Sequence, residues 1–132
     1  MKSNPAEYKP IIQKLLEKTR QRKVDWQEHN QFGKIGFPDT NWFRCNLGSL
    51  GADSFSFEIS NTEKRDGSTI QSLVMMDQSG NEVFRATTNE LPTSPEEEEV
   101  SDLIEEIYGL ARRQALKIEL KLEQASSLLD QV

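Results

Sequence analysis

The sequence predicts one α+β domain in which an antiparallel β-meander of four or five strands lies between a short N-terminal and a long C-terminal helix, both packed on one face of the sheet. Apolar residues recur at helical spacing near both ends of the chain and alternate with polar residues between them, and turn residues separate the alternating runs. A length of 132 residues fits a single domain. We expect bounds of about 5–22, 24–88 and 95–130 for the helix, the sheet and the long helix.

The first helix is predicted from a start signal followed by an apolar face. Asn4, Pro5 and Glu7 have the order of an N-cap, a first-turn proline and a capping-box carboxylate, although Pro10 leaves a later start open. The apolar face then comprises Ile11, Ile12, Leu15 and Leu16. These features predict a helix that ends near Arg22, with its basic residues toward the C-terminal end.

The central region contains short alternating segments with turn residues between them. Predicted strands are Val24 to Trp26, Trp42 to Leu47, the run containing Phe55, Phe57 and Ile59, Ile70 to Asp77, and Glu82 to Thr88. Asp66-Gly67 and the segment Gln78 to Asn81 predict tight turns. Short strands joined by short turns favour an antiparallel meander.

The C-terminal segment predicts a long helix with an unusually extended apolar row. Ser94, Pro95 and Glu97 form an N-cap, a first-turn proline and a capping box. Gly109 lies in the helix interior, where we expect another element to approach closely. The row then keeps a 4-3 spacing through Ile104, Tyr108, Ala111, Ala115, Ile118, Leu122, Ala125 and Leu129.

The last part of this row extends further than a small domain can cover. We therefore expect residues 111–132 to bind the first helix, a second copy of the chain or another helical protein. The candidate partner-binding residues are Ala115, Ile118, Leu122, Ala125 and Leu129. This pattern favours a non-catalytic protein–protein interaction module that self-associates.

Three short motifs resemble a type of short bacterial helix–sheet–helix protein with no assigned function. They are Leu15-Leu16-x-x-Thr19 followed by Trp26, the hairpin Asp77-x-x-Gly80-x-Glu82, and the run Ile107-Tyr108-x-x-Ala111-Arg112-Arg113-Gln114-Ala115. The likeness extends over nearly the whole chain, except for the aromatic segment from Phe32 to Trp42. It implies the helix–sheet–helix order and assigns no activity or ligand.

Two further segments have side chains suited to binding. Phe32, Phe37, Trp42 and Phe43 accompany glycines and a proline, which is consistent with a flap that completes the core or with a lid that binds a small molecule or a partner over the sheet. Lys18, Arg20, Arg22 and Lys23 form a candidate basic patch for a nucleic-acid accessory role. Net charges of +3, −2 and −7 over residues 1–30, 31–89 and 90–132 make nucleic acid the less favoured partner.

The composition disfavours several chemistries. One cysteine, Cys45, and one histidine, His29, offer neither a nucleophile with an oriented base nor a zinc site, so we expect no enzyme activity, no metal and no cofactor. Cys45 instead indicates a buried thiol in a reducing compartment. With no apolar run long enough for a membrane span or a signal peptide, we expect a cytoplasmic protein without membrane contact.

Overall fold

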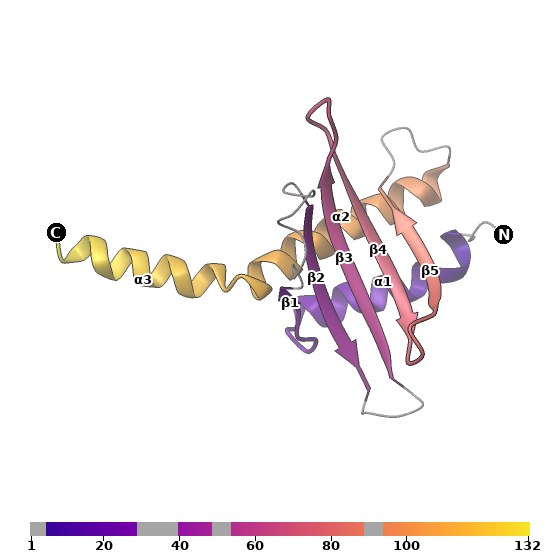
Figure 1. Ribbon diagram of the computed structural model, residues 1–132, viewed down its shortest axis with the longest axis horizontal. Coiled ribbons are helices and arrows are strands. Elements are labelled where there is room, and N and C mark those ends of the chain that lie inside the picture. Colours follow the sequence, from indigo (N-terminus) through magenta and orange to yellow (C-terminus); the bar gives the residue numbers. More distant parts are fainter. Residues whose placement is uncertain (1–4, 29–39, 49–53, 89–93) are drawn as a thin grey trace.

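The computed structural model describes residues 5–28, 40–48, 54–88 and 94–132, and it confirms the α+β class (Figure 1). A five-stranded antiparallel sheet has two helices behind it, and a third helix extends beyond the sheet. The elements in chain order are α1 (Pro5–Arg20), β1 (Gln27–Glu28), β2 (Thr40–Leu47), β3 (Phe55–Glu63), β4 (Thr69–Asp77), β5 (Glu82–Thr87), α2 (Pro95–Ala115) and α3 (Ile118–Asp130).

The sheet is the predicted meander, with spatial order β1-β2-β3-β4-β5 and every neighbouring pair antiparallel. Both predicted turns are present. Gly67 and Gly80 adopt φ values of +87° and +83°, which glycine tolerates best. Asp77 stabilises the second turn because its Oδ1 accepts hydrogen bonds from the backbone N–H groups of Ser79 and Asn81, both at 2.9 Å.

The first predicted strand is wrong in position. Val24 and Trp26 are not in a strand, and the two-residue β1 follows them. Both side chains are buried, and Trp26 Nε1 donates a hydrogen bond of 3.0 Å to Thr19 Oγ1. Their alternation therefore reflects a connecting segment that inserts two apolar side chains into the core beside α1.

The register divides the sheet into a covered and an open face. One transverse row consists of Phe43, Ile59, Leu73 and Ala86, all buried. The adjacent row, whose side chains point to the opposite face, consists of Arg44, Glu58, Val74 and Arg85. A β-bulge between Met75 and Met76 interrupts the pairing of β4 with β5.

The helices cover the first of these faces. Helix α2 contacts all five strands and also packs against α1. Ile12 of α1 and Ile104, Ile107 and Ala111 of α2 are completely buried. Tyr8 stacks on Phe84 of β5 with ring centroids 4.7 Å apart, which anchors the start of α1 to the far edge of the sheet.

The predicted continuous helix over residues 95–130 is wrong at one point. Helix α2 ends at Ala115, with Leu116 as its C-cap, and Lys117 adopts the left-handed conformation before α3 begins at Ile118. Leu116, which lies outside the 4-3 row, packs against the core directly before the break. The start of α2 is as predicted, because Ser94 Oγ accepts a hydrogen bond from Glu97 N at 3.2 Å.

Candidate functional site

Helix α3 presents an apolar row that we call the α3 stripe, namely Ile118, Leu122, Ala125 and Leu129. Ile118 is half-buried, whereas Leu122 and Leu129 are 59% and 72% exposed. From Lys121 onward every side chain of the helix is exposed. Ala115, the fifth predicted partner-binding residue, ends α2 and packs against the core.

The backbone at Lys117 directs α3 away from the rest of the molecule. Figure 1 shows α3 continuing outward past the edge of the sheet, while α1 lies behind the strands. Helix α1 therefore does not cover the exposed residues of the α3 stripe, which was one of the sequence-based expectations. The stripe remains open to solvent in a single chain.

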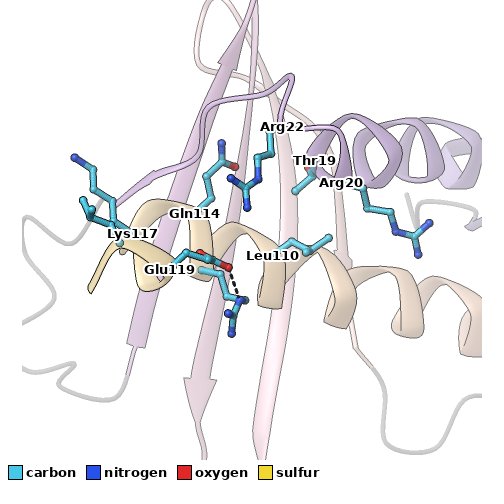
Figure 2. A pocket seen from close by; sticks show the side chains of 9 residues that line it. Thr19, Arg20, Arg22, Leu110, Gln114, Lys117 and Glu119 are labelled. Atoms are coloured by element: carbon cyan, nitrogen blue, oxygen red, sulfur yellow. Dashed lines mark hydrogen bonds and ion pairs between the residues drawn. The ribbon is translucent and has the colours of Figure 1, made fainter. Parts of the chain in front are cut away.

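A second feature is a cavity of about 320 Å³ where the end of α1 meets the α2–α3 junction, which we call the junction pocket (Figure 2). Its walls come from segments far apart in the sequence. The lining residues are Thr19, Arg20, Arg22, Leu110, Arg113, Gln114, Lys117, Glu119 and Leu120. Four of the nine are cationic and one is anionic, so the pocket is strongly positive within a chain of net charge −6.

Two of the pocket cations already have carboxylate partners. Arg20 Nε donates to Glu106 Oε2 at 2.7 Å, and Arg113 Nε donates to Glu119 Oε1 at 3.0 Å. The pKa of Glu119 is lowered by its own backbone N–H, by the bond from Arg113 and by the charge of Arg22. All of these charged side chains are about half exposed, so each ion pair contributes little to folding stability.

The other two cations have no such partner. Within the part of the chain that the structure describes, neither Arg22 nor Lys117 forms an ion pair with a carboxylate. Figure 2 shows the Arg22 guanidinium pointing into the space between α1 and α2, whereas the Lys117 amine lies at the rim. The unpaired positive charge of the pocket is thus concentrated at Arg22.

The backbone of the junction pocket is unusual at the same two residues. Among the described residues, Arg22 and Lys117 alone combine a side chain with positive φ, at 58° and 53°. Each follows the end of a helix, at the position where glycine is most common. Arg22 N donates to Thr19 O at 3.0 Å and Lys23 N to Lys18 O at 2.9 Å, which is the Schellman pattern.

Gln114 is held at the back of the pocket with one polar atom unused. Its Nε2 donates to Val24 O at 2.9 Å. Its Oε1 is buried and has no hydrogen-bond partner within the described segments. Thr19, by contrast, is saturated, because Oγ1 accepts from Trp26 and donates to Leu15 O at 2.8 Å.

The predicted basic patch is therefore only partly a structural unit. Arg20 and Arg22 line the pocket, whereas Lys18 and Lys23 are exposed outside it. Arg113 and Lys117 complete the cluster, and sequence reasoning did not associate them with α1. The available signal was the pair of arginines in the last turn of α2, which alone indicates only a cation near a helix C-terminus.

The aromatic candidates separate in the structure. Phe32 and Phe37 lie outside the described residues. Trp42 and Phe43 belong to β2 and not to a loop, and they point to opposite faces of the sheet. Phe43 is buried in the core beside Tyr108, so it is not a surface anchor, while Trp42 is exposed.

The sulfur and carboxylate groups contribute no further site. Cys45 is buried, as predicted, and burial raises the pKa of its thiol to about 12. In the four described ranges, no group of three or more His, Cys, Asp and Glu side chains is arranged to hold a metal ion. None of the helices described is both long and apolar enough to cross a bilayer.

Comparison with known proteins identifies no relative that could assign a role to either feature. No protein-family model matches the chain, and neither a curated protein nor a solved structure matches it.

Proposed function

We propose that this protein is a non-catalytic interaction module that self-associates through α3. The observation that carries the proposal is the α3 stripe. It projects from the body of the protein, by which we mean the sheet with α1 and α2, and its Leu122 and Leu129 are mostly exposed. Its 4-3 spacing is that of the contact row between two packed helices. A second copy of the chain supplies a row of the same spacing.

Helix stability supports association. Helix α3 has 13 residues, and none of its side chains is buried. Isolated helices shorter than about 12–15 residues are marginal in water because nucleation is unfavourable. Packing two α3 helices together would supply the apolar burial that a single copy lacks.

The expected affinity is modest. Burying Leu122 and Leu129 in both copies would contribute about 1.5–3 kcal/mol for each side chain. Association consumes an estimated 4–15 kcal/mol of lost translational and rotational freedom. Four such side chains give about 6–12 kcal/mol in total, so even the most favourable difference, about 8 kcal/mol, corresponds only to micromolar affinity. The pair is therefore expected to be weak and transient and not permanent.

Charge favours an antiparallel pair related by a two-fold axis. Lys117 lies at the start of α3 and Asp130 at its end, so an antiparallel partner brings the two charges to the same end of the pair. The opposed helix dipoles also favour this orientation. Each copy would then offer the same surface to the other.

The proposal is tested by measuring mass against concentration with light scattering. We expect a dimer at high micromolar concentration, with far-UV circular dichroism showing more helix per residue than in dilute solution. Leu122→Glu combined with Leu129→Glu should give a monomer, because burying unpaired carboxylates is strongly unfavourable.

Ser127→Glu is the matched control, since Ser127 lies on the side of α3 opposite the stripe. It also adds a carboxylate to α3, but away from the stripe, and should leave the measured mass unchanged. A wild-type chain that stays monomeric at high micromolar concentration would refute self-association.

A further inference from the structure

The junction pocket carries a second inference that does not depend on self-association, because one chain supplies all of its walls. Four cations line it, and among the described residues carboxylates pair with Arg20 and Arg113 alone. Those two ion pairs are exposed and weak, so both arginines can turn toward a ligand with little loss of folding stability. The pocket is therefore suited to an anion.

Arg22 is the residue that points most directly to a ligand. It occupies a left-handed position that ordinarily favours glycine, and glycine would stop α1 without backbone strain. With arginine there, the guanidinium points into the cavity and has no carboxylate partner among the described residues. Strained non-glycine residues of this kind are concentrated at binding sites.

The remaining walls specify what else the ligand contains. The buried Gln114 Oε1 lacks a donor, so it can accept a hydrogen bond from a ligand hydroxyl. The start of α3 forms another wall, and no Lys117 side-chain hydrogen bond caps its backbone N–H groups. Leu110 and Leu120 add apolar surface. This combination fits a small molecule that carries both an anionic group and a hydroxyl.

We infer that the junction pocket binds a small phosphate monoester, with the phosphate between Arg22 and Arg113 and a ligand hydroxyl at Gln114. Guanidinium groups match phosphate oxygens in a bidentate geometry, which favours phosphate over a single carboxylate. The volume of about 320 Å³ lies at the lower end of the range for ligand pockets. It therefore suits a compact ester.

Glu119 provides an internal competitor for this site. Its carboxylate accepts a hydrogen bond from Arg113 Nε at 3.0 Å within the pocket, and its own backbone N–H, Arg113 and the charge of Arg22 all lower its pKa. A phosphate that enters must share Arg113 with this carboxylate. Removing the charge of Glu119 should therefore strengthen binding, whereas removing the charge of Arg22 should weaken it.

Isothermal titration calorimetry of the whole chain with ribose 5-phosphate tests the inference, with inorganic phosphate and ribose as comparison probes. We expect saturable binding of the ester that weakens as salt is raised, and none of ribose. Arg22→Gln should weaken binding about tenfold or more, since a charge-assisted bond is lost. Glu119→Gln should strengthen it.

Arg65→Gln is the matched control, because it removes the same charge from an exposed turn outside the pocket. It should leave binding unchanged, and circular dichroism would verify that each variant is folded. Three results would overturn the inference: no saturable binding of the ester, equal binding by the Arg22 and Arg65 variants, or inorganic phosphate binding as tightly as the ester.

Discussion

Gly109 shows how a single residue can differ from its expected role. The sequence suggested a close neighbour, but Gly109 is exposed in α2, and a Cβ added there would meet no atom within 4 Å other than those of its chain neighbours and its own helix backbone. The glycine therefore lowers the stability of the helix without permitting a close contact with another element. No feature of the structure accounts for it.

Gly109→Ala should therefore stabilise the protein by about 1 kcal/mol, which is the difference in helix propensity. Urea denaturation measures this as a higher midpoint with an unchanged slope. Gly67→Ala is the control, because φ is +87° there and alanine should destabilise the turn by about 1–2 kcal/mol. A destabilised Gly109→Ala chain would contradict the exposed environment of Gly109.

The buried thiol of Cys45 should make the free energy of unfolding fall in alkaline solution. Burial, the largest cause, raises the pKa of its thiol to about 12; a backbone hydrogen bond with Phe57 opposes this shift, and the charge of Asp25 adds to it. An unfolded cysteine ionises near about pH 8.5. The folded chain therefore retains a proton that the unfolded chain releases, and the resulting stability is complete below about pH 8.5 and declines above it.

The slope contributed by Cys45 should approach about 1.4 kcal/mol per pH unit between the two pKa values. Urea midpoints measured from about pH 8 to about pH 10 would reveal it, and Cys45→Ala should lack that part of the slope. The comparison concerns slopes, because removing the side chain also leaves a small cavity. Equal slopes in the two proteins would show that the thiol ionises as readily in the folded chain as in the unfolded chain.

At the scale of elements, α3 is structurally separate from the body. None of its residues is buried, whereas Ala111, only a few residues earlier in α2, is completely buried. The body therefore gains little of its folding stability from α3.

A chain that ends at Lys117 should unfold at nearly the same urea concentration as the full chain, within about 0.5 kcal/mol, when both are dilute. A chain that ends at Leu110 loses the buried Ala111 and the last turn of α2, so it should lose about 2 kcal/mol or more. Chemical denaturation followed by tryptophan fluorescence would measure both. A large loss in the first truncation would show that α3 packs on the body.

The elements that could be predicted were those with local signals. Ser94 and Pro95 determine where α2 starts, and the turns at Gly67 and Gly80 follow from residues that tolerate positive φ. The break at Lys117 could not be predicted because lysine is a good helix former and the 4-3 row continues past it. The left-handed Lys117 comes directly after Leu116, which packs against the core, and a tertiary contact of this kind has no local signal in the sequence.

The same difference between local signals and tertiary contacts decides which parts of the candidate site the sequence could predict. The α3 stripe was visible in the sequence because it lies on one helix. The junction pocket was not, because Arg22 follows α1 and Arg113 belongs to α2, and the whole sheet lies between these two segments in the sequence. Their meeting depends on how α1 packs against α2, which apolar spacing does not specify.

The β-bulge between β4 and the outer strand β5 determines how readily that border of the sheet could pair with another strand. A bulge twists an edge strand and spoils its alignment with an incoming strand, and charged side chains add repulsion and desolvation. Glu82 and Arg85 provide such charges on β5 through their 2.8 Å ion pair. Continuous polymerisation by strand addition is thus disfavoured at that border of the sheet.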